Sequence, residues 1–284
     1  MLKKLLGIAP KLESDGSYSP SKLALKLATV QKTDFENISY DKYKGKQSKV
    51  LVIFTEQKNL KMQNGKLFST GNHPVEALLP MLHLKNAGFD FEIATPTGKP
   101  VVFEMWAFPE KDEYVKAIYN DLKSQFAKPK KLSDFIDTSF TKTESYAAVF
   151  VPGGHGAMIG IPEDVNVSKI LNWAHENDLF TISLCHGPGS FLSTTLNNQE
   201  FIYEGYKMAV FPDSVDKKTP MIGYLPGQMP HGLSDKLKSL GAIIVNTKSD
   251  KTVCVDRKLI TGASPLASND LGQLAAKTLL EDLS

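Results

Sequence analysis

Residues 180–190 read FTISLCHGPGS, and this stretch decides the fold. Its first five residues form a short, mainly apolar and β-branched run, which is typical of a strand buried on both faces of a parallel sheet. Pro188 has a φ angle preset for the first turn of a helix and carries no N–H that needs a partner. The stretch therefore predicts a strand, a sharp turn and a helix, with Cys185 at the turn.

Cys185 is the candidate nucleophile of the chain. At such a turn the side chain stands clear of the sheet and lies near the unpaired N–H groups of the helix start. Those donors and the helix dipole favour a thiolate over a thiol. The adjacent His186 is a possible base, although neighbours at a tight turn need not point the same way. The alternative is a structural cysteine in the core, where free cysteines commonly lie.

The composition is that of an ordinary globular protein. The 284 residues suffice for one large α/β domain or two smaller ones. A hydrophobic fraction of 42% and a formal net charge of +2 give no reason to expect nucleic acid or an anionic membrane as partner. Two cysteines are too few for a disulfide framework. The apolar run at residues 5–9 is too short for a signal peptide, and no run approaches the ~18 residues of a membrane helix. We therefore expect a cytoplasmic protein.

Strand and helix patterns alternate along most of the chain. The expected strands are 49–54, 89–94, 146–151, 180–184, 207–211, 242–245, 252–255 and 258–261. The expected helices are 74–88, 112–126, 168–177, 233–240 and one that begins at 264. Pro80 should kink the first of these helices or split it. This alternation predicts a doubly wound α/β sandwich whose ligand site lies at the carboxyl ends of the strands.

Two segments depart from this alternation. Residues 1–47 are polar and form either a floppy tail or an arm that packs on the α/β domain of residues 48–284 or on a second subunit. The candidate anchors of such an arm are Phe35, Ile38, Tyr40 and Tyr43. Residues 104–145 interrupt the strand–helix rhythm, and we expect them to form an insertion beside the main sheet.

Three loops at the carboxyl ends of strands should meet at one edge of the sheet. They are the loop before Pro74, the pair Gly153 and Gly154, and the turn at Cys185. Glycines at the end of a strand let backbone N–H groups face a ligand at close range. Glu76 lies in the first turn of the helix after Pro74. A glutamate there commonly compensates the helix dipole, so its catalytic interpretation depends on the other two loops.

Several motifs resemble one known superfamily. FSTGNHPVE (68–76), VPGGHG (151–156) and SLCHGP (183–188) together resemble the ThiJ/PfpI superfamily. The motifs GKLFSTGNHP, PKKL, FPDSVD, IGYLPG and LITGASP resemble its HchA-type heat-shock group, which combines a glutathione-independent glyoxalase (glyoxalase III) with a holding chaperone. The resemblance covers about residue 48 to the C-terminus and is weak before it. It implies a flavodoxin-like, mostly parallel α/β fold of the class I glutamine amidotransferase type, with a small added domain, and a homodimer.

The resemblance also implies roles for particular residues. Cys185 is the nucleophile with His186 beside it, and Glu76 is the acid–base next to the sulfur. Asp216 of FPDSVD orients His186. Asp213 is the competing acid in that motif, and each of the two aspartates could instead cap a turn.

The same resemblance implies which N–H groups hold an oxyanion and shows which metal ligands of the group are replaced in this chain. The N–H groups of His186 and Gly154, with Gly153 beside them, would hold the oxyanion. The two-His, one-carboxylate surface metal site of the group falls at Lys85, Asp90 and Leu122. Only the aspartate among these could bind a metal, so we expect no metal and no other cofactor.

The implied substrates are small dicarbonyls such as methylglyoxal and glyoxal. The Cys185 thiolate would add to the aldehyde of methylglyoxal, and Glu76 would move a proton between the two carbons through an enediol. Water would then release lactate. A related attack on hemithioacetals and aminocarbinols would give deglycase activity on glycated proteins or nucleic acids.

Other interpretations stay open. A holding chaperone would bind unfolded proteins on exposed apolar surface. A cysteine peptidase could use the same Cys-His-Asp set, although Glu76 beside a thiolate suits proton transfer on a small aldehyde better. An amidotransferase is weaker still, because no synthetase domain is present.

The remaining histidines and the second cysteine receive simpler predictions. His73 and His155 are expected near the pocket, and His175 and His231 at the surface or in packing. Cys254 lies in the apolar triplet VCV and is expected to be buried and inert.

Overall fold

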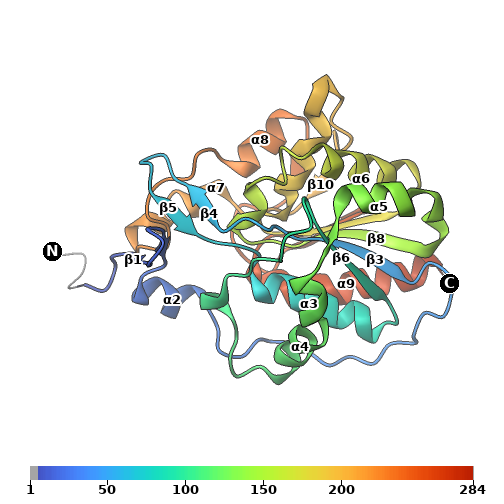
Figure 1. Cartoon of the computed structure of the whole chain (residues 1–284), viewed down its shortest axis with the longest axis horizontal. Helices are drawn as coiled ribbons and strands as arrows, with labels where there is room; N and C mark the ends of the chain where they lie inside the picture. Colours follow the sequence, from blue (N-terminus) through green and yellow to red (C-terminus); the bar gives the residue numbers. More distant parts are fainter. Residues whose placement is uncertain (1–5, 284) are drawn as a thin grey trace.

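The computed structural model describes residues 6–283, and its centre is a sheet of seven strands between two layers of helices (Figure 1). The strand order is β12-β13-β9-β8-β3-β6-β7, and every pair is parallel except β12 with β13. The bounds are β3 (Lys49–Ile53), β6 (Asp90–Thr95), β7 (Lys130–Lys131), β8 (Tyr146–Val151), β9 (Phe180–Leu184), β12 (Val253–Asp256) and β13 (Leu259–Gly262). The inner strands β6-β3-β8-β9-β13 have the flavodoxin-like order 2-1-3-4-5, which confirms the predicted fold class.

The strands separate two hydrophobic cores. Every residue of β8 and β9 is buried, as their apolar sequences predict. Successive side chains of a strand point to opposite faces, so the same strands supply both cores. Val50, Val52, Phe150 and Ile182 belong to one core. Leu51, Ile53, Val149 and Val151 belong to the other.

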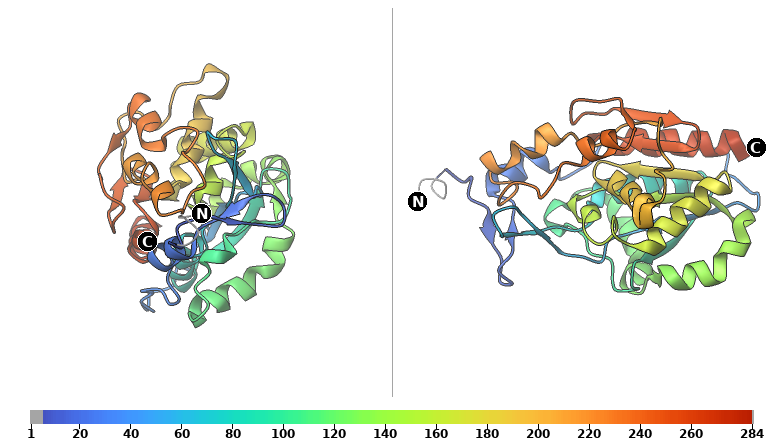
Figure 2. Two further views of the ribbon diagram at one scale, coloured as in Figure 1. Left: turned by 90° about the vertical axis from the view of Figure 1, so that its left-hand side faces the viewer. Right: turned by 90° about the horizontal axis from the view of Figure 1, so that it is seen from above.

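Helices cover each face of the sheet (Figure 2). The first core is covered by α3 (Pro74–Asn86), α4 (Glu113–Ala127) and α9 (Ser268–Leu283). The second is covered by α5 (Leu132–Ser139), α6 (Val165–Glu176) and α8 (Leu233–Ser239). Strands alternate with helices on both faces, so the doubly wound arrangement expected from the sequence is present.

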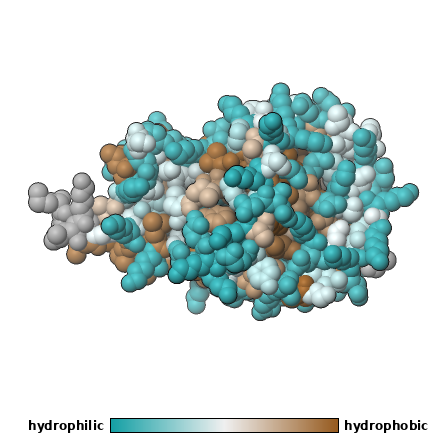
Figure 3. Space-filling model, turned by 60° about the horizontal axis from the view of Figure 1, so that its bottom comes forward, coloured by the Kyte–Doolittle hydropathy of each residue, from teal (hydrophilic) through white to brown (hydrophobic). Residues whose placement is uncertain are grey.

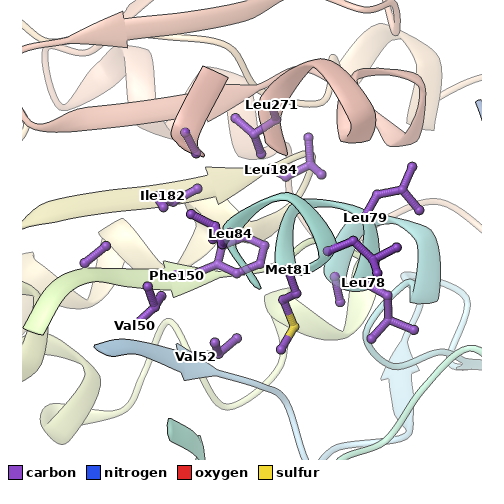
Figure 4. Packing of buried hydrophobic residues seen from close by; sticks show 14 of the residues in the cluster. Val50, Val52, Leu78, Leu79, Met81, Leu84, Phe150, Ile182, Leu184 and Leu271 are labelled. Carbon is purple, nitrogen blue, oxygen red and sulfur yellow. The ribbon is translucent and has the colours of Figure 1, made fainter. Parts of the chain in front are cut away.

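Helix α3 is buried on all sides. Its residues 74–84 are all buried between the sheet and its neighbouring helices. Figure 4 shows Met81 and Leu84 of α3 directed toward the strand residues Val52 and Phe150. The helix is continuous through Pro80, so the proline does not split it into two pieces.

A small second sheet lies at one end of the molecule. Its order is β1-β2-β5-β4, with β1 (Lys11–Leu12), β2 (Tyr18–Ser19), β4 (Asn59–Lys61) and β5 (Leu67–Ser69). Helix α2 (Lys22–Ala28) follows β2, and its N-cap Ser21 donates a hydrogen bond to the Ile222 carbonyl. The segment 104–145 contributes α4, α5 and the edge strand β7, which pairs with β6 of the main sheet.

The N-terminal arm packs on its own domain through three of the four expected aromatic or apolar anchors. The Phe35 ring lies 4.9 Å from that of His83, and Tyr43 stacks on Phe89 at 5.4 Å. The Tyr40 hydroxyl lies 2.8 Å from His83 Nδ1. Ile38 is half-buried. Residues 1–5 of the expected arm lie outside the described residues.

No helix within residues 6–283 is long and apolar enough to span a lipid bilayer.

We predict that His83 makes the stability of the protein depend on pH. Its Nε2 lies 2.9 Å from Asn269 Oδ1, and burial lowers the pKa of His83 even though the Asn269 contact opposes this. The unfolded chain therefore binds a proton more readily, and acidification below about pH 6.5 favours unfolding. His83→Gln should be less stable than the wild type by about 1–3 kcal/mol at pH 8. The difference in stability between the two proteins should narrow at pH 5.5. At that pH the unfolded wild type gains a proton at residue 83, and the glutamine variant does not.

Urea unfolding of both proteins at pH 8 and pH 5.5 measures this difference. A difference that stays constant between the two pH values would contradict the prediction.

Candidate active site

The turn after β9 holds Cys185 in a strained backbone conformation. Its φ is 60°, a left-handed value that is uncommon for a residue other than glycine. Its N–H donates to the Gly262 carbonyl at 2.8 Å, and its own carbonyl accepts from the Phe211 N–H at 2.9 Å. The 3₁₀ helix η4 (Gly187–Asn198) follows, with Pro188 in its first turn. The strand, turn and helix predicted from the sequence are therefore present, and neighbouring chain segments fix the turn.

A hydrogen-bonded chain leads from the sulfur to a buried aspartate. Cys185 Sγ lies 3.4 Å from His186 Nδ1, and His186 Nε2 lies 2.7 Å from Asp216 Oδ2. The other oxygen of Asp216 lies 3.0 Å from His155 Nε2. The rings of His155 and His186 lie 4.0 Å apart, so one carboxylate serves two adjacent imidazoles. Burial opposes ionisation of Asp216, but the two histidines hold its pKa well below the usual range.

The structure separates the two aspartates of the FPDSVD motif. Both lie in the short helix α7 (Asp213–Asp216). The carboxylate of Asp213 accepts hydrogen bonds from the N–H groups of Ser234 and Asp235 at 3.0 and 2.9 Å. It therefore caps the start of α8, whereas Asp216 reaches His186.

Glu76 lies in the first turn of α3 and faces the sulfur. Burial, and then the nearby Glu104, raise the pKa of Glu76 well above its ordinary value. The Cys185 thiol and the Gly154 N–H face this carboxyl and oppose the shift. A side chain at Gly153 would collide with Glu76 Oε2 and approach Cys185 Cβ to 2.9 Å. Only glycine therefore allows the carboxyl and the thiol to lie this close together.

The thiol of Cys185 does not have the lowered pKa that the helix start alone predicts. Burial, then the charges of Glu76 and Asp216, raise its pKa well above the ordinary value. The N–H of His186 acts in the opposite direction, but its effect is smaller. Two carboxyl groups from distant parts of the chain disfavour a further negative charge beside them, and the helix start does not outweigh this effect.

Two functional candidates were missed by the sequence reasoning. Glu104 is 1% exposed, and burial raises its pKa to about 7. Tyr224 packs against His155 at a ring distance of 5.8 Å, and burial, then Glu104, raise the pKa of its hydroxyl. A signal for Glu104 existed, because it is a single carboxylate in the apolar run VVFEMW.

These side chains line one cavity of about 310 Å³, called the central cavity here. Its polar wall includes His73, Glu76, Glu104, His155 and His186. The wall also contains Leu27, Val30 and Leu266, which are 65%, 46% and 53% exposed and so lie at the mouth. The first two belong to the N-terminal arm, which therefore forms part of the entrance.

The positions of the remaining histidines agree with those expected from the sequence, whereas the position of Cys254 does not. His73 is the N-cap of α3 and lines the central cavity with His155, as expected. His175 is exposed beside Tyr203, and His231 is half-buried. The prediction that Cys254 is buried is wrong, because its edge strand β12 leaves it half-exposed.

Metal-ligand geometry within the described residues is confined to one cluster. His155, His186 and Asp216 each offer one atom within 4.8 Å of the others. These atoms already bond to one another, so a metal would have to break both contacts to the aspartate. At the surface positions considered from the sequence, Lys85 pairs with Asp121 at 2.6 Å and Leu122 is buried.

The flavodoxin strand order and the cysteine on a strained strand-to-helix turn, beside a buried glutamate, define a protein of the ThiJ/PfpI superfamily. The chain is 47% identical over 270 residues to the protein/nucleic acid deglycase HchA of Escherichia coli O157:H7, which covers 95% of this chain and 94% of that protein. The chain belongs to the HchA family. No protein-family model matches the sequence.

Two solved structures share the fold at lower identity. Glyoxalase III from Candida albicans has a TM-score of 0.62 and 23% identity, covering 81% of this chain and 98% of that one. The 24 kDa rapid encystment protein of Francisella tularensis has a TM-score of 0.69 and 20% identity, covering 82% of this chain and 99% of that one. Both support the fold assignment.

We predict that Glu76→Gln makes the Cys185 thiol more reactive toward iodoacetamide at pH 7.5. The substitution removes the neighbouring charge that raises the thiol pKa most, after burial. The thiolate fraction should rise roughly tenfold for each unit by which the pKa falls. Alkylation rates measured against pH, in a Cys254→Ser background that leaves one thiol, test this. An unchanged or slower rate would show that Glu76 does not hold the pKa up.

Proposed function

We propose that the protein converts methylglyoxal and related 2-oxoaldehydes to 2-hydroxy acids without glutathione, at Cys185. One observation supports this most strongly: a buried glutamate and a buried thiol face each other in the central cavity. Such a pair suits addition to an aldehyde followed by proton transfer between adjacent carbons. A relative in the same family is named a protein/nucleic acid deglycase, and a structural neighbour is named glyoxalase III.

The reaction begins with formation of the thiolate. His186 Nδ1 is positioned to take the thiol proton, and Asp216 stabilises the resulting imidazolium. The sulfur then adds to the aldehyde carbon, the His186 imidazolium gives its proton to the aldehyde oxygen, and a neutral hemithioacetal results. We assign the N–H groups of His186 and Gly154, with Gly153 beside them, to the new oxyanion.

Glu76 then performs the carbon chemistry. Its ionised carboxyl takes the proton from the former aldehyde carbon and returns it to the neighbouring carbon. The result is a thioester of lactate, which water hydrolyses to free the thiol. A raised pKa makes Glu76 a stronger base for this step than an exposed glutamate would be.

Deglycase activity would use the same atoms. A hemithioacetal or aminocarbinol on a protein or nucleic acid presents the same two adjacent carbons. The partly exposed mouth at Leu27 and Leu266 gives such a substituent a way into the central cavity. Peptide cleavage is less well supported, because it gives the buried Glu76 no role.

Lactate formation from methylglyoxal without glutathione tests the proposal. Wild-type protein should turn over, Cys185→Ala should be inactive, and Glu76→Gln should lose at least about 100-fold in kcat. Asp216→Asn should lose less, because it weakens the orientation of His186 without removing a reacting group. Lactate from Cys185→Ala at the wild-type rate, or none from folded wild type, would reject the assignment.

Holding unfolded proteins is a second candidate function, favoured by exposed leucines on the N-terminal arm. Leu6, Leu12 and Leu27 are 58%, 60% and 65% exposed. Figure 3 shows hydrophobic surface at the end of the molecule that carries this arm. Cys185→Ala should then still suppress aggregation of a heated client, whereas Leu12→Ser with Leu27→Ser should not. Equal suppression by both variants would exclude this surface.

The homodimer and the cytoplasmic location stay predictions. Both cysteines are free, which fits a reducing compartment. Sedimentation analysis of the purified chain would measure its oligomeric state.

A further inference from the structure

Glu104 is held by the same loop that precedes the catalytic helix α3. Its N–H donates to the Asn72 carbonyl at 3.0 Å, and the Asn72 N–H bonds to the Val102 carbonyl at 2.8 Å. Its Oε1 accepts a hydrogen bond from the Thr70 hydroxyl. Residues 70–72 lead directly into α3, which carries Glu76. The two carboxyls are therefore positioned by one connected piece of backbone.

The second oxygen of Glu104 accepts no hydrogen bond of good geometry from the described residues, although the N–H groups of Gly71 and His155 lie near the carboxyl. Three buried atoms without a hydrogen-bond partner among the described residues belong to the wall of the central cavity: Glu104 Oε2, Glu76 Oε2 and His73 Nδ1. Buried polar atoms normally have partners, and unpaired ones cost free energy. The two adjacent oxygens of a 2-oxoaldehyde would accept hydrogen bonds from these carboxyls in their protonated form.

Four side chains interact with the Glu104 carboxyl. They are Thr70, Glu76 from α3, His155 and Tyr224. Burial raises the pKa of Glu104 to about 7, while His155 and Thr70 oppose this shift. Two neighbouring carboxyls resist ionising together. The pair can therefore share one proton, which leaves one carboxyl as an acid and the other as a base.

We propose that Glu104 is a second catalytic carboxyl, which moves protons on the two substrate oxygens while Glu76 moves the proton on the carbons. This inference rests on the proposed function and names a residue for a step that Glu76 alone leaves incomplete. Removal of the carbon proton places negative charge on the ketone oxygen. In a buried site that already contains carboxyls, a proton donor at this oxygen lowers the cost of that charge.

The two carboxyls balance the reaction. In the first half, the Glu76 carboxylate takes the proton from C1 of the hemithioacetal, the C1–C2 double bond forms, and protonated Glu104 gives its proton to the C2 oxygen. In the second half, Glu76 protonates C2, and the Glu104 carboxylate takes the proton from the C1 oxygen as the thioester carbonyl forms. Both residues return to their starting states, and water then hydrolyses the thioester.

Glu104→Gln tests this assignment because it keeps the shape and removes the proton. We expect kcat to fall by about 10²–10⁴-fold, the usual range for general acid–base catalysis, with a much smaller change in KM. Wild-type activity should fall at alkaline pH, since the pair of raised-pKa carboxyls loses its shared proton there. The Gln variant should lack this loss. An unchanged kcat and pH profile would overturn the proposal.

Glu56→Gln is the matched control. Glu56 is 9% exposed, accepts hydrogen bonds from Thr97 and Lys99, and does not line the central cavity. The same chemical change there should leave kcat of the folded protein within about twofold of wild type, since Glu56 lies outside the reaction. An equal loss in both variants would show that burying an amide, rather than losing an acid, lowers activity.

Thr70→Val provides a second test, which remains informative if Glu104→Gln does not fold. The Thr70 hydrogen bond favours the ionised form of Glu104 and lowers its pKa. Its loss should move the alkaline decline of activity to higher pH. A decline that stays in place would contradict the assignment.

Trapping separates this inference from the proposed function. With methylglyoxal, Glu104→Gln should accumulate a covalent adduct on Cys185 that native mass spectrometry of the intact protein detects and that slows alkylation of Cys185 by iodoacetamide, because thiol addition precedes the Glu104 step. Lactate from wild type with neither adduct nor slowing in Glu104→Gln would overturn the role of Glu104 alone. No lactate and no adduct in wild type would overturn the proposed function and this inference with it.

Discussion

The strained backbone at Cys185 is the constraint on which the site depends. A left-handed φ at a non-glycine residue costs about 1–3 kcal/mol and persists only where the surroundings fix it. Here β13 accepts the N–H of Cys185, the Phe211 segment donates to its carbonyl, and a side chain at Gly187 would collide with the Val151 carbonyl. The parallel sheet thus supplies the rigidity, and the turn places the sulfur outside the sheet between a glutamate and a histidine.

Burial of several ionisable groups in one small space gives the cavity its chemistry. Asp216 stays ionised because two histidines share it, whereas burial raises the pKa values of Glu76, Glu104 and the Cys185 thiol. Burial acts on all of these groups, but their different hydrogen-bond and charge partners give them different pKa values. Such divergence of similar groups allows one site to hold an acid and a base together.

Helix α3 connects this chemistry to the rest of the molecule. Its first turn carries Glu76, its middle packs on the sheet and α9, and His83 near its end receives Tyr40 of the N-terminal arm. A side chain at Gly272 of α9 would approach His83 to 2.6 Å and Pro80 to 2.9 Å, so the two helices pack closely. The arm also supplies Leu27 and Val30 to the mouth of the cavity. Arm, core and site therefore share one buried helix.

The sequence by itself determined the strand–turn–helix at Cys185, the alternation that produces the doubly wound sheet, and the candidates Glu76, His186 and Asp216. These features follow from local periodicity, from proline and glycine chemistry, and from motif resemblance, all of which are read along the chain. The tertiary structure decided that Asp213 caps α8, that His155 shares Asp216, that the thiol pKa is raised, and that Glu104 faces the cavity. The physical reason is that burial and charge neighbours come from residues far apart in sequence, and only folding brings them within reach of one another.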